Sequence, residues 1–159
     1  MSDVIISSDV REAIDRSVLC WLATATRAGE PSVSPKQVFT HRDGTILISN
    51  IASPNSAKNI KANPSVCVVV LDIFRQKGYQ LYGRADVVTS ADASFEALAA
   101  PLRDIAGDAF PFRSIFRVEV IRVALILAPR YRLNPETTEA DQVEDAMRSY
   151  GVRPDSEPS

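Results

Sequence analysis

One segment of the chain concentrates side chains that could bind an anion. Residues 49–59 leave a predicted strand, turn, and enter a predicted helix that begins at Ser53-Pro54. The first turn of a helix offers unpaired N–H groups and a partial positive charge, which favour phosphate. This segment also carries three hydroxyl groups and one ammonium group that could bind phosphate, on Ser49, Ser53, Ser56 and Lys58. Serines that only cap the helix beside a solvated lysine would give the same pattern, so both interpretations stay open.

A second unusual segment lies upstream, at residues 33–37. Pro35 stands inside a predicted strand, where it removes a donor from the hydrogen-bond ladder. The proline could protect an exposed sheet edge. Alternatively, neighbouring N–H groups become free to face a planar ligand. The residue types are compatible with either interpretation.

Other kinds of chemistry lack the residues they need. His41 is the only histidine, so neither a histidine-based metal site nor a Ser/His/Asp triad is expected. Cys20 and Cys67 lie in apolar runs without a CxxC motif, which predicts reduced, buried thiols. Residues 1–133 hold 16 basic and 13 acidic residues, too small a surplus to predict a nucleic-acid surface.

The bulk composition predicts one domain followed by a short extension. The chain has 159 residues, of which 45% are hydrophobic, enough for a single core. No apolar run approaches the roughly 20 residues that cross a bilayer, and the N-terminus lacks a basic-then-apolar leader, so we expect a cytoplasmic protein without membrane partners. We expect a domain over residues 1–133 and an acidic helix with a flexible tail over 134–159, which holds 7 acidic and 2 basic residues.

Alternating apolar residues and turn signals predict a mainly β protein with added helices. Gly83 should mark a bulge, and Pro101 should kink or restart the helix that contains it. We expect six antiparallel strands at 20–26, 32–40, 45–50, 65–74, 79–89 and 113–127. We expect helices capped by Ser8 or Asp9, after strand three at 53–63, after strand five at 91–106, and at 138–150. Such an order is typical of a small, closed or nearly closed, Greek-key-like barrel.

The order of these features resembles the pyridoxamine 5′-phosphate oxidase-like family of FMN-binding split β-barrels. The resemblance covers residues 10–130, about three-quarters of the chain. Six segments carry it: Ser34-Pro35-Lys36, Asp43-Gly44, the strand 46–50, Ser56-Ala57-Lys58-Asn59-Ile60, Asn63-Pro64-Ser65-Val66 and Gly83-Arg84-Ala85.

The resemblance implies where FMN would bind. By analogy with the family, the phosphate would lie at Ser49, Asn50, Ser56 and Lys58, with Lys58 as its main anchor, and we include the neighbouring Ser53 and Asn59 in the predicted cofactor site. Strand two would line the isoalloxazine ring through Ser34, Pro35, Lys36 and Gln37. The resemblance further implies a homodimer with each flavin at the subunit interface.

The chain departs from true pyridoxamine-phosphate oxidases at several positions. Strand two has no arginine, Ala57 precedes Lys58 where those enzymes have an Arg-Lys pair, and the C-terminus is acidic. We therefore expect an FMN-dependent oxidoreductase acting on another small substrate, with an electron donor such as NAD(P)H. Two alternatives stay open: a flavin-binding, storage or sensor module without turnover, and a reductase that uses a deazaflavin.

Overall fold

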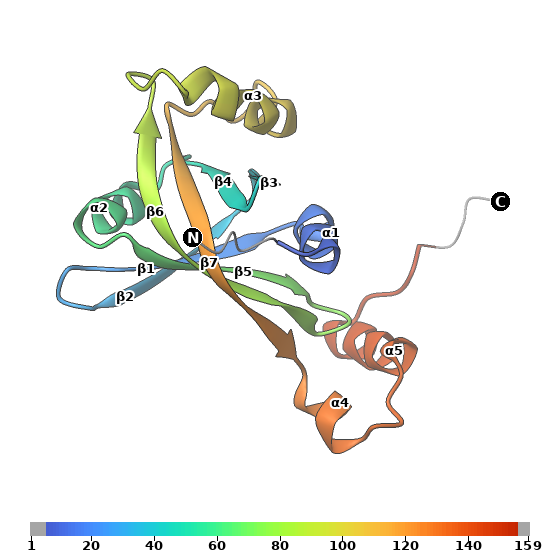
Figure 1. Ribbon diagram of the computed structural model, residues 1–159. Helices are drawn as coiled ribbons and strands as arrows, with labels where there is room; N and C mark the ends of the chain where they lie inside the picture. Colours follow the sequence, from blue (N-terminus) through green and yellow to red (C-terminus); the bar gives the residue numbers. More distant parts are fainter. Residues whose placement is uncertain (1–5, 156–159) are drawn as a thin grey trace.

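A computed structural model of the chain describes residues 6–155, which form one antiparallel sheet with helices around it (Figure 1). The sheet has seven strands in the order β2-β1-β5-β6-β7-β4-β3. Their bounds are β1 (Cys20–Ala25), β2 (Pro31–Lys36), β3 (Phe39–Arg42), β4 (Thr45–Ser49), β5 (Ser65–Asp72), β6 (Lys77–Thr89) and β7 (Ser114–Leu127). Residues 1–5 and 156–159, which include the end of the predicted tail, lie outside the described part.

The predicted second strand, 32–40, is in fact two strands, so the prediction of six strands was wrong by one. β2 pairs with β1, whereas β3 pairs with β4 at the opposite edge of the sheet. The chain must therefore turn between them, at Gln37 and Val38. The carbonyl oxygen of Val38 accepts a hydrogen bond from the backbone N–H of Ser49, 3.0 Å away, which fixes this turn. Both sheet edges thus come from one continuous segment, which is how the sheet curves into a split barrel.

β6 and β7 are the longest strands and cross the whole molecule (Figure 1). Their pairing shifts register between Tyr82 and Gly83, which confirms the predicted bulge. A Cβ atom at Gly83 would collide with the carbonyl oxygen of Glu119, so only glycine allows this close approach.

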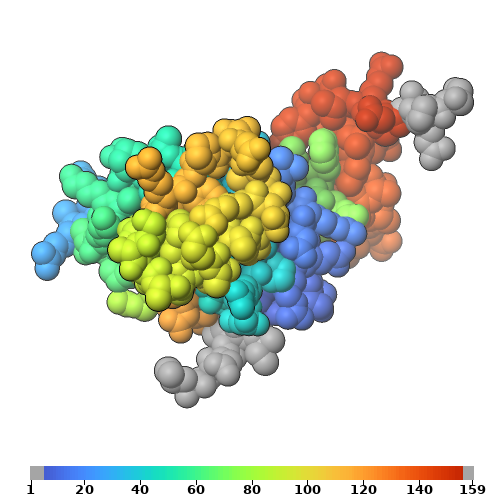
Figure 2. Space-filling model, turned by 90° about the horizontal axis from the view of Figure 1, so that it is seen from above, coloured from blue at the N-terminus to red at the C-terminus, as the bar shows by residue number. Residues whose placement is uncertain are grey.

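Apolar side chains form two cores inside this sheet. The larger core joins the inner sheet face to α1 (Ser8–Arg16) and α2 (Pro54–Ala62), and includes Ile14, Leu22, Ile60, Val68, Leu81 and Phe116. The smaller core lies under α3 (Phe95–Ala106) and includes Leu47, Val88, Leu102 and Ile115. Figure 2 shows α3 in yellow, covering one end of the barrel.

The helices occur where the sequence predicted them, with differences at their ends. α1 is capped by Ser7, whose hydroxyl accepts from the N–H of Val10, and not by Ser8 or Asp9. α3 begins four residues later than predicted and continues through Pro101 without restarting. The helices after the third and fifth predicted strands, α2 and α3, are confirmed.

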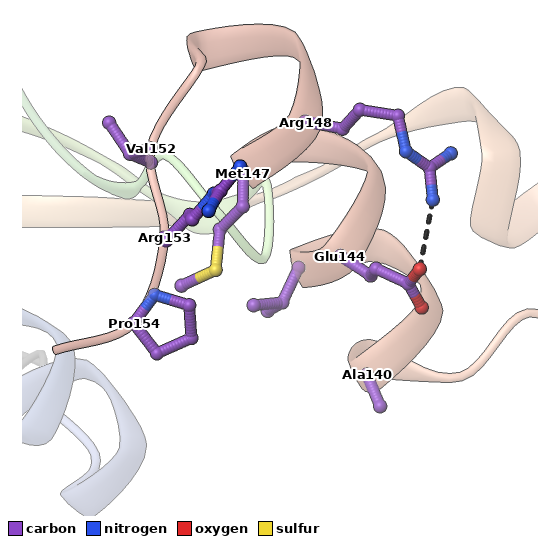
Figure 3. Close-up of a pocket in the computed structure, with 8 residues that line it drawn as sticks. Ala140, Glu144, Met147, Arg148, Val152, Arg153 and Pro154 are labelled. Atoms are coloured by element: carbon purple, nitrogen blue, oxygen red, sulfur yellow. Dashed lines mark hydrogen bonds and ion pairs between the residues drawn. The ribbon is translucent and has the colours of Figure 1, made fainter. Parts of the chain in front are cut away.

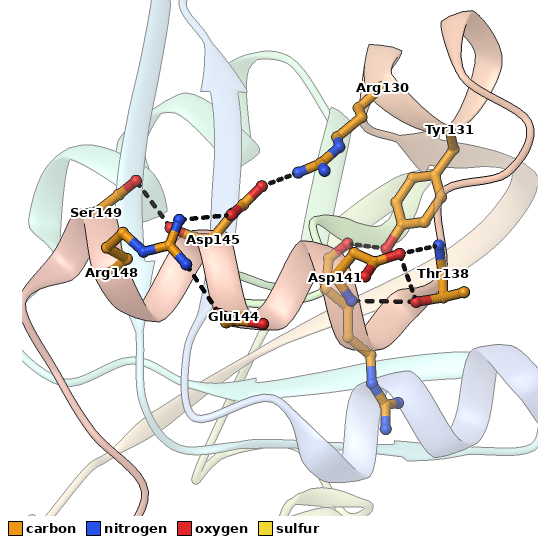
Figure 4. A network of polar contacts seen from close by, with 9 residues as sticks. Arg130, Tyr131, Thr138, Asp141, Glu144, Asp145, Arg148 and Ser149 are labelled. Atoms are coloured by element: carbon orange, nitrogen blue, oxygen red, sulfur yellow. Dashed lines mark hydrogen bonds and ion pairs between the residues drawn. The ribbon is translucent and has the colours of Figure 1, made fainter.

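Two helices follow β7 at the end of the sheet opposite α3. The short helix α4 (Pro129–Leu133) was not predicted, and α5 (Glu139–Tyr150) confirms the predicted C-terminal helix. The α5 carboxylates are engaged within the protein: Glu139 bonds Lys77 at 2.7 Å, and Asp145 pairs with Arg130. Figure 4 shows the remaining polar contacts of α4 and α5, including the capping box of Thr138 and Asp141. The four carboxylates of α5 are therefore each ion-paired or hydrogen-bonded within the protein.

No helix among residues 6–155 is long and apolar enough to cross a membrane.

Candidate functional site

Strand β2 and the start of α2 meet through two side-chain hydrogen bonds. The Nζ atom of Lys36 donates to the hydroxyl of Ser53 at 2.6 Å, immediately before α2. The hydroxyls of Ser34 and Ser56 lie 3.3 Å apart. We call these four residues the Lys36 cluster. It brings together the two segments that sequence analysis identified separately, 33–37 and 49–59.

The strand alternation of β2 explains why Lys36 points into the barrel. Successive side chains of a strand face opposite sides of the sheet. Val33 and Pro35 are exposed, whereas Ser34 is half-buried and Lys36 is only 6% exposed. Lys36 stands opposite Cys20 of β1 and reaches inward until its Nζ lies 5.9 Å from the ring centre of Phe116 on β7.

The ammonium group of Lys36 has no anionic partner among residues 6–155. No carboxylate of these residues forms an ion pair with it, and its one hydrogen bond goes to the neutral hydroxyl of Ser53. Burial lowers the pKa of Lys36 below its usual value, because the charged form loses its hydration. Burial raises the pKa of the neighbouring Cys20 thiol to about 12, so this thiol is neutral and supplies no charge. A buried cation of this kind attracts an anionic ligand.

The Ser53 side chain does not cap α2. Its hydroxyl accepts from Lys36 and donates to the carbonyl oxygen of Ile51 at 3.2 Å, and it makes no hydrogen bond to the helix N–H groups. The interpretation that Ser53 only caps the helix is therefore wrong. The preceding turn is held by Asn50, whose Oδ1 accepts from the N–H of Ser53 at 3.2 Å and whose Nδ2 donates to the hydroxyl of Ser114 at 2.9 Å.

Two predicted site residues are buried and turned away from the Lys36 cluster. The hydroxyl of Ser49 donates to the carbonyl oxygen of Val38 at 3.3 Å. Nδ2 of Asn59 donates to the hydroxyl of Thr24 at 3.0 Å and so ties α2 to β1. In this structure these contacts support the backbone around the cluster.

Three other predicted residues are exposed. Pro35 and Gln37 flank Lys36 at the end of β2, and Lys58 lies on the surface of α2. The side chains of Gln37 and Lys58 make no hydrogen bond or ion pair to other residues in the part of the chain that the structure describes. The structure thus groups Ser34, Lys36, Ser53 and Ser56, and leaves Lys58 outside.

Sequence analysis missed two supporting residues, Thr24 and Ser114. Thr24 is 4% exposed on an inward-facing position of β1, where a polar residue interrupts an apolar alternation. That interruption was the signal that could have identified it. Ser114 begins β7 and carries no comparable signal.

An apolar cavity of about 460 Å³ lies elsewhere, between α5 and the residues that follow it (Figure 3). Its lining includes Val143, Met147, Val152 and Pro154. None of the predicted site residues lines it.

The comparisons with known proteins agree on the fold. Residues 6–128 match the sequence model of the family described as pyridoxamine 5′-phosphate oxidase. HupZ from Group A Streptococcus is 21% identical, with a TM-score of 0.67 over 78% of this chain and 96% of that one. A comparison with curated protein sequences found no match.

Two further solved structures share this fold. An FMN-binding protein from Syntrophomonas wolfei is 16% identical, with a TM-score of 0.62 over 77% of this chain and 87% of that one. The heme storage protein HutZ from Vibrio cholerae is 16% identical, with a TM-score of 0.63 over 77% of this chain and 94% of that one. Identities this low show a shared fold, and the prediction of a split β-barrel is confirmed.

Proposed function

Because this chain belongs to the pyridoxamine 5′-phosphate oxidase family, we propose that it is a flavoprotein that binds FMN, with the phosphate at the Lys36 cluster. The observation that carries the proposal is the buried ammonium of Lys36 without a carboxylate partner. A phosphate beside it would supply the missing negative charge through a charge-assisted hydrogen bond. The adjacent start of α2 would add backbone N–H groups and its partial positive charge.

The other predicted residues take supporting places in this proposal. Asn50 and Asn59 hold the backbone on either side of the phosphate subsite, as their hydrogen bonds to Ser114 and Thr24 suggest. Pro35 and Gln37, exposed at the end of β2, would line the ring. Lys58 would add a second positive charge at the solvent-facing side of the phosphate, which makes it secondary to Lys36.

We further propose a homodimer formed through the outer face of the sheet. Trp21 and Val33, 42% and 60% exposed, lie on this face of β1 and β2. Beyond them Cys67 of β5 stands opposite Tyr82 of β6, whose ring carries the guanidinium of Arg122 at 3.6 Å. A continuous face of apolar and aromatic side chains is typical of a protein interface. β2 carries both this face and the Lys36 cluster, which would place each flavin next to the partner subunit.

The proposed activity is that of an oxidoreductase in the cytoplasm. FMN, when bound, would supply hydride or electron transfer, while the protein binds and orients it. The substrate would be a small molecule, with NAD(P)H as a possible donor class. The free thiols of Cys20 and Cys67 are compatible with a reducing compartment. A storage or sensor module without turnover is the alternative for the same site. A deazaflavin ranks below FMN, because its long anionic tail would need more basic residues than Lys58 and Lys61, the two exposed lysines of α2.

The absorbance spectrum of the protein purified without added cofactor tests the proposal. We expect a flavin spectrum and release of FMN on heating. A colourless protein that does not bind added FMN would refute the proposal. Flavin-dependent consumption of NAD(P)H would favour the enzyme, whereas tight binding without turnover would favour the storage or sensor module.

A further inference from the structure

The surroundings of Lys36 raise the question of how a buried amine keeps its proton before a ligand arrives. Three groups face it: the Cys20 thiol from β1, the Ser53 hydroxyl from the segment before α2, and the Phe116 ring from β7. The thiol is neutral, and the other two are uncharged. Of the described residues, no carboxylate, imidazole or second ammonium is hydrogen-bonded or ion-paired to it. The charged form is therefore stabilised only by one hydroxyl and the face of one ring.

We propose that anion binding at the Lys36 cluster is coupled to the uptake of one proton by the Nζ atom of Lys36. In the ligand-free protein the neutral form of Lys36 is populated at lower pH than that of an exposed lysine. When a phosphate group arrives, the lone pair of Nζ takes a proton from the solvent, and the resulting ammonium donates to a phosphate oxygen. One N–H bond forms at Nζ, one bond to hydrogen breaks in the hydronium or buffer acid that gives the proton, and no bond of the phosphate changes. This inference rests on the proposed function, since it concerns the same site.

The burial of Lys36 and the direction of its pKa support this coupling. Lys36 is 6% exposed, so water can stabilise its charge only weakly. The lowered pKa has desolvation as its main cause. A negative phosphate nearby acts in the opposite direction and favours the charged amine. Binding and protonation must then strengthen each other, because linkage between two equilibria is reciprocal.

The coupling makes affinity fall as pH rises. The second pKa of a phosphate monoester is about 6, so above about pH 7.5 the phosphate itself takes up no proton on binding. Once the pH exceeds the pKa of Lys36 in the free protein, the dissociation constant should rise by up to about tenfold per pH unit. The site would thereby select for phosphorylated over unphosphorylated flavin most strongly near neutral pH.

Isothermal titration calorimetry with FMN tests the coupling on the full-length protein. Titrations at about pH 9 in two buffers of different ionisation enthalpy give the number of protons taken up. We expect a fraction of one proton for the wild type, and the same value for Lys61→Met, which changes an exposed lysine on α2. Lys36→Arg keeps a charge that does not titrate in this range, so its proton uptake should be zero and its affinity independent of pH between about 7.5 and 9.5.

The outcomes separate the two proposals. FMN binding by the wild type without proton uptake, or with the same uptake as Lys36→Arg, would overturn the coupling and leave the proposed function standing. If Lys36→Arg does not fold, the wild-type proton count decides alone. A wild type that does not bind FMN at any pH would overturn both.

Discussion

Replacing Lys36 with methionine should stabilise the ligand-free protein and weaken FMN binding at the same time. The two side chains have similar length, so methionine can occupy the same space beside Phe116. Burying an ionised side chain costs several kcal/mol in real proteins. Lys36 recovers about 1.5–3 kcal/mol through its bond to Ser53, and only about 0.5–1 kcal/mol from the Phe116 ring, because the 5.9 Å separation is near the outer limit of such contacts. Ser53 keeps a partner in the variant, because its hydroxyl also donates to Ile51.

These terms predict a net stabilisation of about 1–3 kcal/mol at neutral pH. For a domain of this size the melting temperature should rise by about 3–9 °C. FMN affinity should fall by about 1.5–3 kcal/mol, roughly 10- to 150-fold, because the phosphate loses a charge-assisted hydrogen bond. Residues that act only in packing do not produce such opposite effects.

Relative to Lys36→Met, the wild type should gain stability as pH rises. The pKa of Lys36 in the folded protein is lower than in the unfolded chain. Between that lowered pKa and about 10.4, the unfolded chain therefore binds more protons than the folded protein. The contribution of Lys36 to the free energy of unfolding increases with pH wherever this holds, whereas the raised pKa of Cys20, present in both proteins, lowers the free energy of unfolding above about pH 8.5. In Lys36→Met this contribution is absent.

Urea unfolding at several pH values and FMN titration followed by flavin fluorescence measure both effects. Lys61→Met is the matched control, since it removes an exposed lysine from the same region and should leave both quantities nearly unchanged. A Lys36→Met variant that is less stable than the wild type, yet binds FMN with wild-type affinity, would refute the reasoning.

Three further predictions follow from particular contacts. Asn59→Ala leaves the buried Thr24 hydroxyl without its partner and should lower stability by about 1–3 kcal/mol, measured by urea unfolding; unchanged stability would mean that water replaces the amide. Lys58→Ala should weaken FMN binding less than about fivefold in calorimetry, because an exposed charge is screened; a larger loss than in Lys36→Met would reverse the assigned roles. Trp21→Glu places a charge on the outer sheet face and should convert the proposed dimer to monomer in sedimentation analysis; a dimer of unchanged mass would exclude this face as the interface.

Local signals in the sequence predicted most of the fold. The Asp43-Gly44 turn, the apolar run of β5 and the Asn63-Pro64 helix end each depend on neighbouring residues, and all three occur as expected. The break between β2 and β3 could not be predicted in this way. Residues 32–40 favour extended backbone throughout, and only the pairing of β3 with β4 across the barrel shows that the strand is divided.

For the same reason the residue pattern alone gave the candidate site as two separate segments, which only the family resemblance joined through one FMN. Nothing in the local sequence indicates that Ser34 contacts Ser56, 22 positions further along the chain. The strand alternation gave the side of the sheet on which each residue lies, but not which side of β2 is covered by α2. Tertiary packing decides that, and it turned Lys36 inward while leaving Lys58 in solvent.

This difference between the two lysines changes how the site should be understood. The family resemblance made Lys58 the expected main anchor, and Lys58 lies on the helix whose start favours phosphate. An exposed ammonium, however, is already solvated by water and gains little from a phosphate. Lys36 has lost that solvation on folding, so an anion beside it would stabilise the charge that water no longer solvates. In the proposed site, a bound phosphate would relieve the unfavourable burial of the Lys36 charge and so favour a phosphorylated ligand, and stability and affinity should therefore change in opposite directions when the charge is removed.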